Sequence, residues 1–185
     1  MPKALLNRPE KDGELRRVQA LLWGRHGDPM QAESFFAKHG PETPVMLMGR
    51  GILASRQGRN RDAAGFFAAA LAKAPRDGLV LREYAIFEYT AGDLGRARTL
   101  MADALKLRPR DCYGQFFQAR ISDDTGDRAG AQRLYREVLK AVPRDSEVHM
   151  HYGRSLGASG RMCEGFVPLA YSALYAQDRR RAATM

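Results

Sequence analysis

The sequence predicts an all-α fold, a right-handed α-solenoid of about five stacked antiparallel helix pairs. Three observations predict it. The tripeptide Pro-Arg-Asp occurs at 75–77, 109–111 and 143–145, each copy 34 residues after the last. The same step separates four glycines and four small residues: Gly58, Gly92, Gly126 and Gly160, then Ala63, Ala97, Ala131 and Gly165. Stacked repeats of this kind present one long surface and no single catalytic pocket.

The period divides the chain into successive repeat units. Residues 1–12 carry no repeat signal and are expected to form an N-terminal linker, and residues 13–185 form the repeat domain. The units run from about 13–43 to 44–77, 78–111, 112–145 and 146–185. The first is three residues shorter than the others, which predicts a tighter joint to the second.

Each unit is predicted to hold two helices. In 44–77, Leu47, Gly51 and Ala54 recur at helical spacing until Gly58, which tolerates the left-handed conformation that closes a helix. A second helix follows, and Pro75 ends it because proline cannot continue the hydrogen-bond ladder. Its apolar face is formed by Ala63, Phe67, Ala70 and Leu71. Small residues at Gly51 and Ala63 allow the two backbones to approach closely.

The last unit departs from the pattern. Pro168 falls inside its second helix and is expected to kink that helix or delay its start. Shifted by half a period, residues 163–185 read as a further unit, and the chain then stops at Met185 inside that unit's second helix. We therefore expect a fragment of a longer protein, or an array whose last helix is frayed.

The repeated residues resemble the tetratricopeptide repeat. That family places a small residue eighth, a Gly near fifteenth, an Ala twentieth, an aromatic residue near twenty-fourth and a Pro thirty-second. The unit that begins at Pro44 matches with Gly51, Gly58, Ala63, Phe67 and Pro75. The resemblance covers residues 13–185 and implies stacked helical hairpins that recognise other proteins.

The resemblance also implies a binding groove, because the first helix of each unit lines the concave face in this family. Residue by residue, the implied partner-binding set is Val45, Met48, Ile52, Arg56, Leu79, Arg82, Ile86, Tyr89, Tyr113, Phe116, Arg120, Met150 and Arg154. An apolar lining edged by arginines favours a protein or peptide with apolar anchors and acidic flanks. Replacing Met48 and Phe116 with Glu is expected to abolish binding and leave stability unchanged. Alternatively, a segment of the same parent protein fills the groove.

One family activity is not expected. Met48 and Ile52 stand where the members that bind chaperone tails carry Lys and Asn, so the carboxylate clamp is not expected here.

The charge balance leaves two further alternatives open. The chain has 30 Lys and Arg against 21 Asp and Glu, a formal net charge of +9. This excess indicates either solvated convex faces or an acidic partner. An RNA-binding helical repeat is the second function class, but the recurrent aromatic residues sit at packing positions, which disfavours nucleic acid. No apolar stretch reaches the roughly 18–20 residues of a membrane span.

Catalytic and metal-binding motifs are not found in the sequence, so a non-catalytic chain without a cofactor or metal is expected. His-Glu-x-x-His is absent. His149 and His151 are two residues apart on a helix and point to nearly opposite sides. The only cysteines, Cys112 and Cys163, lack metal-type spacing.

A finer resemblance concerns the two ends of the repeat region. Residues 17–22 with 28–36, and residues 171–183, are similar to the repeat region that follows the protease domain in bacterial zinc metalloproteases of the outer-membrane quality-control type. The resemblance implies a C-terminal periplasmic module that recruits substrate or assembly partners; otherwise a cytoplasmic location is expected. The uncapped C-terminal hairpin also predicts self-association.

Overall fold

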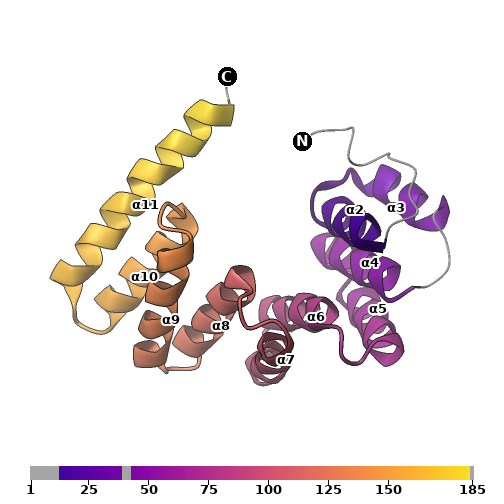
Figure 1. The fold of residues 1–185 in the computed structure, drawn as a ribbon, viewed down its shortest axis with the longest axis horizontal. Helices are drawn as coiled ribbons and strands as arrows, with labels where there is room; N and C mark the ends of the chain where they lie inside the picture. Colours follow the sequence, from indigo (N-terminus) through magenta and orange to yellow (C-terminus); the bar gives the residue numbers. More distant parts are fainter. Residues whose placement is uncertain (1–12, 39–42, 184–185) are drawn as a thin grey trace. The chain divides into compact units, whose positions relative to one another are not determined.

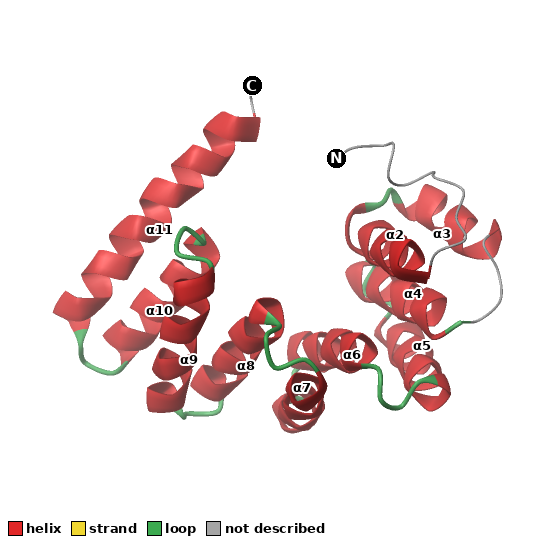
Figure 2. Ribbon diagram, in the orientation of Figure 1, coloured by secondary structure: helices red, strands yellow, loops and turns green. Residues whose placement is uncertain are grey.

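The computed structural model describes residues 13–38 and 43–183, and every regular element in these two stretches is an α-helix (Figure 1, Figure 2). The all-α prediction is confirmed, while the expected linker at 1–12 lies outside the described residues. The ten helices are α2 (Gly13–His26), α3 (Pro29–Lys38), α4 (Pro44–Arg56), α5 (Asn60–Lys73), α6 (Gly78–Ala91), α7 (Leu94–Leu107), α8 (Cys112–Asp124), α9 (Arg128–Ala141), α10 (Ser146–Ala158) and α11 (Met162–Ala183).

The helices belong to two compact units. The N-terminal unit, Met1–Leu107, contains α2 to α7, and the C-terminal unit, Arg108–Met185, contains α8 to α11. Within each unit, consecutive helices pack as pairs, such as α4 with α5 and α10 with α11.

The repeated tripeptide has a clear structural role at the start of each first helix. Its aspartate is the N-cap: an Asp77 carboxylate oxygen accepts from the backbone N–H of Leu79 at 2.9 Å, and Asp111 accepts from Gly114 at 3.1 Å. Asp145 does the same for Glu147 at 2.9 Å. An N-cap satisfies N–H groups that have no partner within the helix, so Pro ends one helix and Asp begins the next.

The glycines with the 34-residue step close the first helices as predicted. Gly58, Gly92, Gly126 and Gly160 have φ values of 72°, 95°, 93° and 78°, in the left-handed region. A side chain is strained at such angles, which explains why the same residue type recurs there.

Small residues bring the two helices of a pair together. A Cβ atom at Gly51 would lie 3.0 Å from the Phe67 ring, and one at Gly153 would lie 2.7 Å from Leu169. A larger side chain at either position would push the helices apart. The predicted close approach is therefore confirmed in the second and last pairs.

The last helix corrects one expectation. Pro168 does not delay the start of α11, and residues 163–183 do not form a new hairpin, because one helix runs from Met162 to Ala183 (Figure 1). The helix continues through Pro168 although a proline removes one hydrogen bond and its ring crowds the carbonyl four residues earlier. The turn before it is held against α10, where a Cβ at Gly165 would lie 2.7 Å from the Gly153 carbonyl oxygen.

Candidate functional site

Half of the eight predicted groove residues in the N-terminal unit are buried. Met48, Ile52, Leu79 and Arg82 are buried, whereas Val45, Ile86 and Tyr89 are half-buried and Arg56 is exposed. Met48 has 0% of its surface exposed. A charged group in a fully buried position is destabilising, so the expectation that Met48→Glu leaves stability unchanged is corrected here.

Helix α2 explains part of this burial. It lies so close to α4 that a Cβ at Gly24 would be 2.8 Å from the Gly49 carbonyl oxygen and 3.0 Å from the Ile52 Cβ. Arg56 Nη1 donates to the carbonyl oxygens of Gly24 and Gly27 at 3.0 and 3.2 Å. Arg56, predicted to meet a partner, therefore holds the end of α2.

Ion pairs then connect α2 to α6, two helix pairs further along the chain. Arg17 Nη2 lies 2.9 Å from an Asp77 carboxylate oxygen. Arg25 Nη2 donates to both carboxylate oxygens of Glu83, at 2.7 and 2.8 Å. The long arginine side chains link α2 to α6. Both helices contact α4, in which Met48 and Ile52 are buried.

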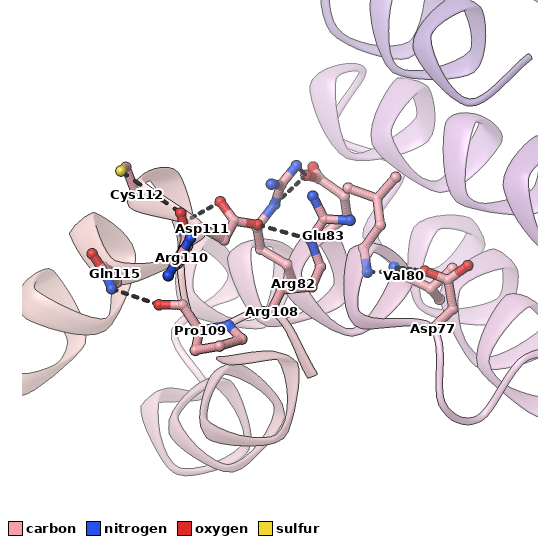
Figure 3. A network of polar contacts seen from close by, with 12 residues as sticks. Asp77, Val80, Arg82, Glu83, Arg108, Pro109, Arg110, Asp111, Cys112 and Gln115 are labelled. Atoms are coloured by element: carbon pink, nitrogen blue, oxygen red, sulfur yellow. Dashed lines mark hydrogen bonds and ion pairs between the residues drawn. The ribbon is translucent and has the colours of Figure 1, made fainter. Parts of the chain in front are cut away.

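Arg82 contacts the same buried carboxylate. Its Nε and Nη2 donate to Glu83 Oε1 at 3.0 and 2.6 Å, and Glu83 is 3% exposed (Figure 3). Arg82 was predicted to pair with partner carboxylates, but in this structure a carboxylate of the same helix engages it. Its role in partner binding stays a prediction, as does that of the other twelve residues.

The C-terminal unit is more open at its predicted residues. Tyr113 is 40% exposed and Arg154 is exposed, while Arg120 and Met150 are half-buried. Phe116 is only 3% exposed, so the expectation that Phe116→Glu spares stability is corrected as it was for Met48.

A pocket of about 210 Å³ lies between α8, α9 and α10. Two predicted residues, Tyr113 and Phe116, form part of its wall. The remaining lining was not predicted and consists of Cys112, Val138, Val142, Asp145, Glu147 and Val148. Three valines and two aromatic rings give the pocket an apolar interior, with two carboxylates at its edge. Concave apolar sites with a few polar groups are typical binding sites.

The carboxylates at this edge already have partners. Asp145 accepts from the backbone N–H groups of Glu147 and Val148 at 2.9 and 3.2 Å. Glu147 lies 3.8 Å from Arg120 Nη1 in an ion pair. The Arg120 guanidinium also stands 4.9 Å above the Phe117 ring, which fixes its position by a cation–π contact.

His151 lies behind this wall as a neutral group. Its ring centroid is 5.5 Å from that of Phe116 and 6.5 Å from that of Tyr135. Burial, with the nearby positive charges of Arg120 and Arg154, lowers the pKa of His151 to about 4. His149 instead contacts Tyr171 and Tyr175 of α11, so the two histidines face different helices as predicted.

Part of the unpredicted lining had a signal in the sequence. Glu147 shares the repeat position of Tyr113, 34 residues earlier, so the register of the repeat indicates it as a candidate. Val138 and Val142 have only the i, i+4 spacing of any core helix, which does not distinguish pocket residues from core residues.

Neither a metal site nor a membrane span is found in the described part of the chain. Across residues 13–38 and 43–183, no three His, Cys, Asp or Glu residues are grouped to hold a metal ion. No helix in the same stretches is long and apolar enough to cross a bilayer.

Comparison with known families gives a match along most of the chain. The family model of the tetratricopeptide repeat matches residues 15–78, 48–111 and 118–164. This family describes a helical repeat, with no catalytic centre of its own. No curated protein matches the sequence.

Solved structures of a protein named MamA are similar in fold. One MamA crystal structure has a TM-score of 0.70 at 13% identity and covers 94% of this chain and 99% of that chain. MamA from Desulfovibrio magneticus RS-1, from residue 41 to its end, has a TM-score of 0.71 at 14% identity, covering 91% and 97%. MamA AMB-1 gives 0.72 at 16% identity, covering 88% and 98%. At such low identity the likeness shows the fold alone.

Proposed function

This chain belongs to the tetratricopeptide repeat family, and we propose that it is a non-catalytic protein–protein interaction module. The observation that supports this function best is the apolar pocket between α8, α9 and α10, with Tyr113 exposed beside it. Binding energy at protein interfaces is concentrated in a few large side chains that fill such pockets. The proposed ligand is a peptide or protein segment that inserts one large apolar side chain here.

The charges along α8 and α10 favour acidic residues next to that anchor. Each helix carries a predicted apolar residue followed four residues later by arginine: Phe116 by Arg120, and Met150 by Arg154. A segment that continues from the pocket along these helices meets guanidinium groups, which bind carboxylates in a planar, two-pronged geometry. Arg154 is exposed and within reach of such a segment.

A peptide selection tests this proposal. A random peptide library displayed on phage is selected against the whole chain, and Kd values of the enriched peptides are measured. We expect enriched sequences with a large apolar residue beside acidic ones, and at least tenfold weaker binding to Tyr113→Glu. The matched control is Tyr171→Glu on α11, because Tyr171 is 44% exposed and Tyr113 is 40% exposed.

Two results would overturn the proposal. One is undiminished binding of the selected peptides to Tyr113→Glu. The other is a chain that enriches no peptides but binds single-stranded RNA with an affinity that falls steeply with salt, which supports the RNA-binding alternative.

Two finer expectations stay predictions beside this proposal. The first is that the chain is a module of a periplasmic zinc metalloprotease, on which the MamA and repeat matches do not bear. Self-association through the last helix pair is tested by sedimentation velocity over a range of protein concentrations.

A further inference from the structure

Helix α11 carries an exposed apolar face on its outer side. Met162 and Phe166 are each 72% exposed, and Val167, Leu169 and Leu174 are also exposed. Residues four or seven apart lie on one side of a helix, so Met162, Phe166 and Leu169 form one row. Val167 and Leu174 form a second row about a third of a turn away, and the two rows together make a wide apolar face. Contiguous apolar patches are uncommon on soluble proteins and mark interaction sites.

The internal repeat shows what is unusual about this face. Leu169 occupies the repeat position of Phe67, Met101 and Tyr135, which are 1%, 0% and 0% exposed, whereas Leu169 is 40% exposed. On its inner side Leu169 packs over Gly153, as Phe67 packs over Gly51. The contact within the pair is therefore the same for α4 with α5 and for α10 with α11. The two pairs differ only in whether the outer side of the residue is covered.

In two earlier pairs, α4 with α5 and α8 with α9, the first helix of the next pair supplies that cover. The Phe67 ring stacks on Tyr84 and Phe87 of α6, with centroids 5.3 and 5.4 Å apart. The Tyr135 ring of α9 lies 6.2 Å from that of Tyr152 in α10. The exposed surface around Leu169 is therefore expected to accept a helix that presents aromatic side chains.

The exposed apolar face of α11 is also wider than the surface around Leu169 that a stacked helix would cover. Val167 and Leu174 stand at positions that are exposed in the earlier second helices. Those positions hold small, polar or basic residues, namely Gly65, Thr99 and Arg133, then Ala72, Lys106 and Lys140. A stacked helix leaves them in water in the earlier pairs, so an apolar residue there enlarges the surface for a partner.

We propose that this face of α11 binds an amphipathic helix of a partner protein, with two aromatic side chains three residues apart and an acidic polar face. The aromatic pair follows the pattern of Tyr84 and Phe87 on Phe67. The acidic face follows from the formal net charge of +9, because a second copy of the chain brings charge of the same sign. This site is separate from the pocket at Tyr113 and does not depend on it.

A peptide of residues 77–92 of the chain itself is the probe. It contains the aromatic pair and three acidic residues, Asp77, Glu83 and Glu88, against a single Arg82. A hydrocarbon staple on the polar face keeps it helical, since a helix of this length is marginal alone in water. Fluorescence anisotropy of the labelled peptide measures its affinity for the whole chain.

We expect saturable binding that Phe166→Glu weakens at least tenfold. The Phe166 side chain is exposed, so circular dichroism should show unchanged helix content in this variant. The matched control is Met30→Glu on α3, which is 83% exposed and far from α11 in the sequence, and which should bind normally. A peptide with Tyr84→Ala and Phe87→Ala should not bind.

Three results overturn the inference: no binding of the stapled peptide, equal binding to the wild type and Phe166→Glu, or equal binding of the peptide without its aromatic pair. Sedimentation velocity can give a fourth result that overturns the inference. A dimer that Phe166→Glu separates would identify a second copy of the chain as the occupant of this face.

Discussion

Arg25 on α2 donates from a single nitrogen to both carboxylate oxygens of Glu83 on α6, at 2.7 and 2.8 Å. Arg82 contacts the same carboxylate, so two guanidinium groups share one acidic partner that is almost completely buried. Removing one member of a buried ion pair leaves an uncompensated charge, which costs much more than losing a surface pair.

Glu83→Ala should therefore lower the free energy of unfolding by about 3–5 kcal/mol. The matched control is Glu33→Ala, which removes an exposed ion pair with Arg59 of 3.0 Å and should cost no more than about 1 kcal/mol. Urea denaturation of both variants measures the difference. Equal costs for the two variants would show that Glu83 is not desolvated as described.

Met48→Glu should destabilise the chain by several kcal/mol, because a carboxylate would enter a site with no exposed surface. Tyr113→Glu should change the melting temperature little, since its side chain is 40% exposed. Differential scanning calorimetry compares the two. A melting temperature for Met48→Glu close to that of the wild type would mean that Met48 reaches solvent and lines an open groove after all.

Two Gly→Ala substitutions should have opposite signs. Gly92→Ala should cost about 1–2 kcal/mol, because the residue has φ of 95° and an L side chain is strained there. Gly65→Ala should stabilise by roughly 0.5–1 kcal/mol, because Gly65 lies inside α5 with no atom near enough to meet a Cβ. Chemical denaturation measures both, and the same sign for the two variants would contradict the described backbone.

His151 should make stability fall under mild acid. Its pKa is lowered to about 4 in the folded chain from an ordinary value of 6.5, so the unfolded chain takes up the proton first. The contribution is fully present above pH 6.5 and is lost as pH falls toward 4, amounting to at most about 3 kcal/mol.

The measurement is the pH dependence of the urea midpoint between pH 7 and pH 4 for the wild type and His151→Gln. His151→Gln should show a smaller slope across this range, since glutamine does not titrate. A wild-type slope in His151→Gln would assign the effect to other groups.

The repeat predicted the helix pairs because it reports local chemistry. Gly58 and Gly92 close helices, and Pro75 stops one, through backbone properties that need no knowledge of distant neighbours. The capping role of Asp77 is equally local, because aspartate is among the residues preferred at helix N-caps.

The burial of the predicted groove residues could not be predicted in the same way. It accompanies the close contact of Gly24 with Gly49 and the reach of Arg17 and Arg25 to α6, and neither follows the repeat period. The pocket likewise forms from three separate segments that only the packed helices bring together. Register along a repeat identifies which residues share a face, while packing decides which of them remain accessible.

The ion pairs from α2 to α6 also change how the N-terminal unit should unfold. Repeat arrays are commonly treated as a row in which each repeat interacts only with its immediate neighbours, so that terminal repeats fray one at a time. Here the first pair is bonded to the third through Arg17 with Asp77 and Arg25 with Glu83. Loss of α2 removes contacts from two later pairs at once, so this end of the array should melt as one cooperative block, without stepwise fraying.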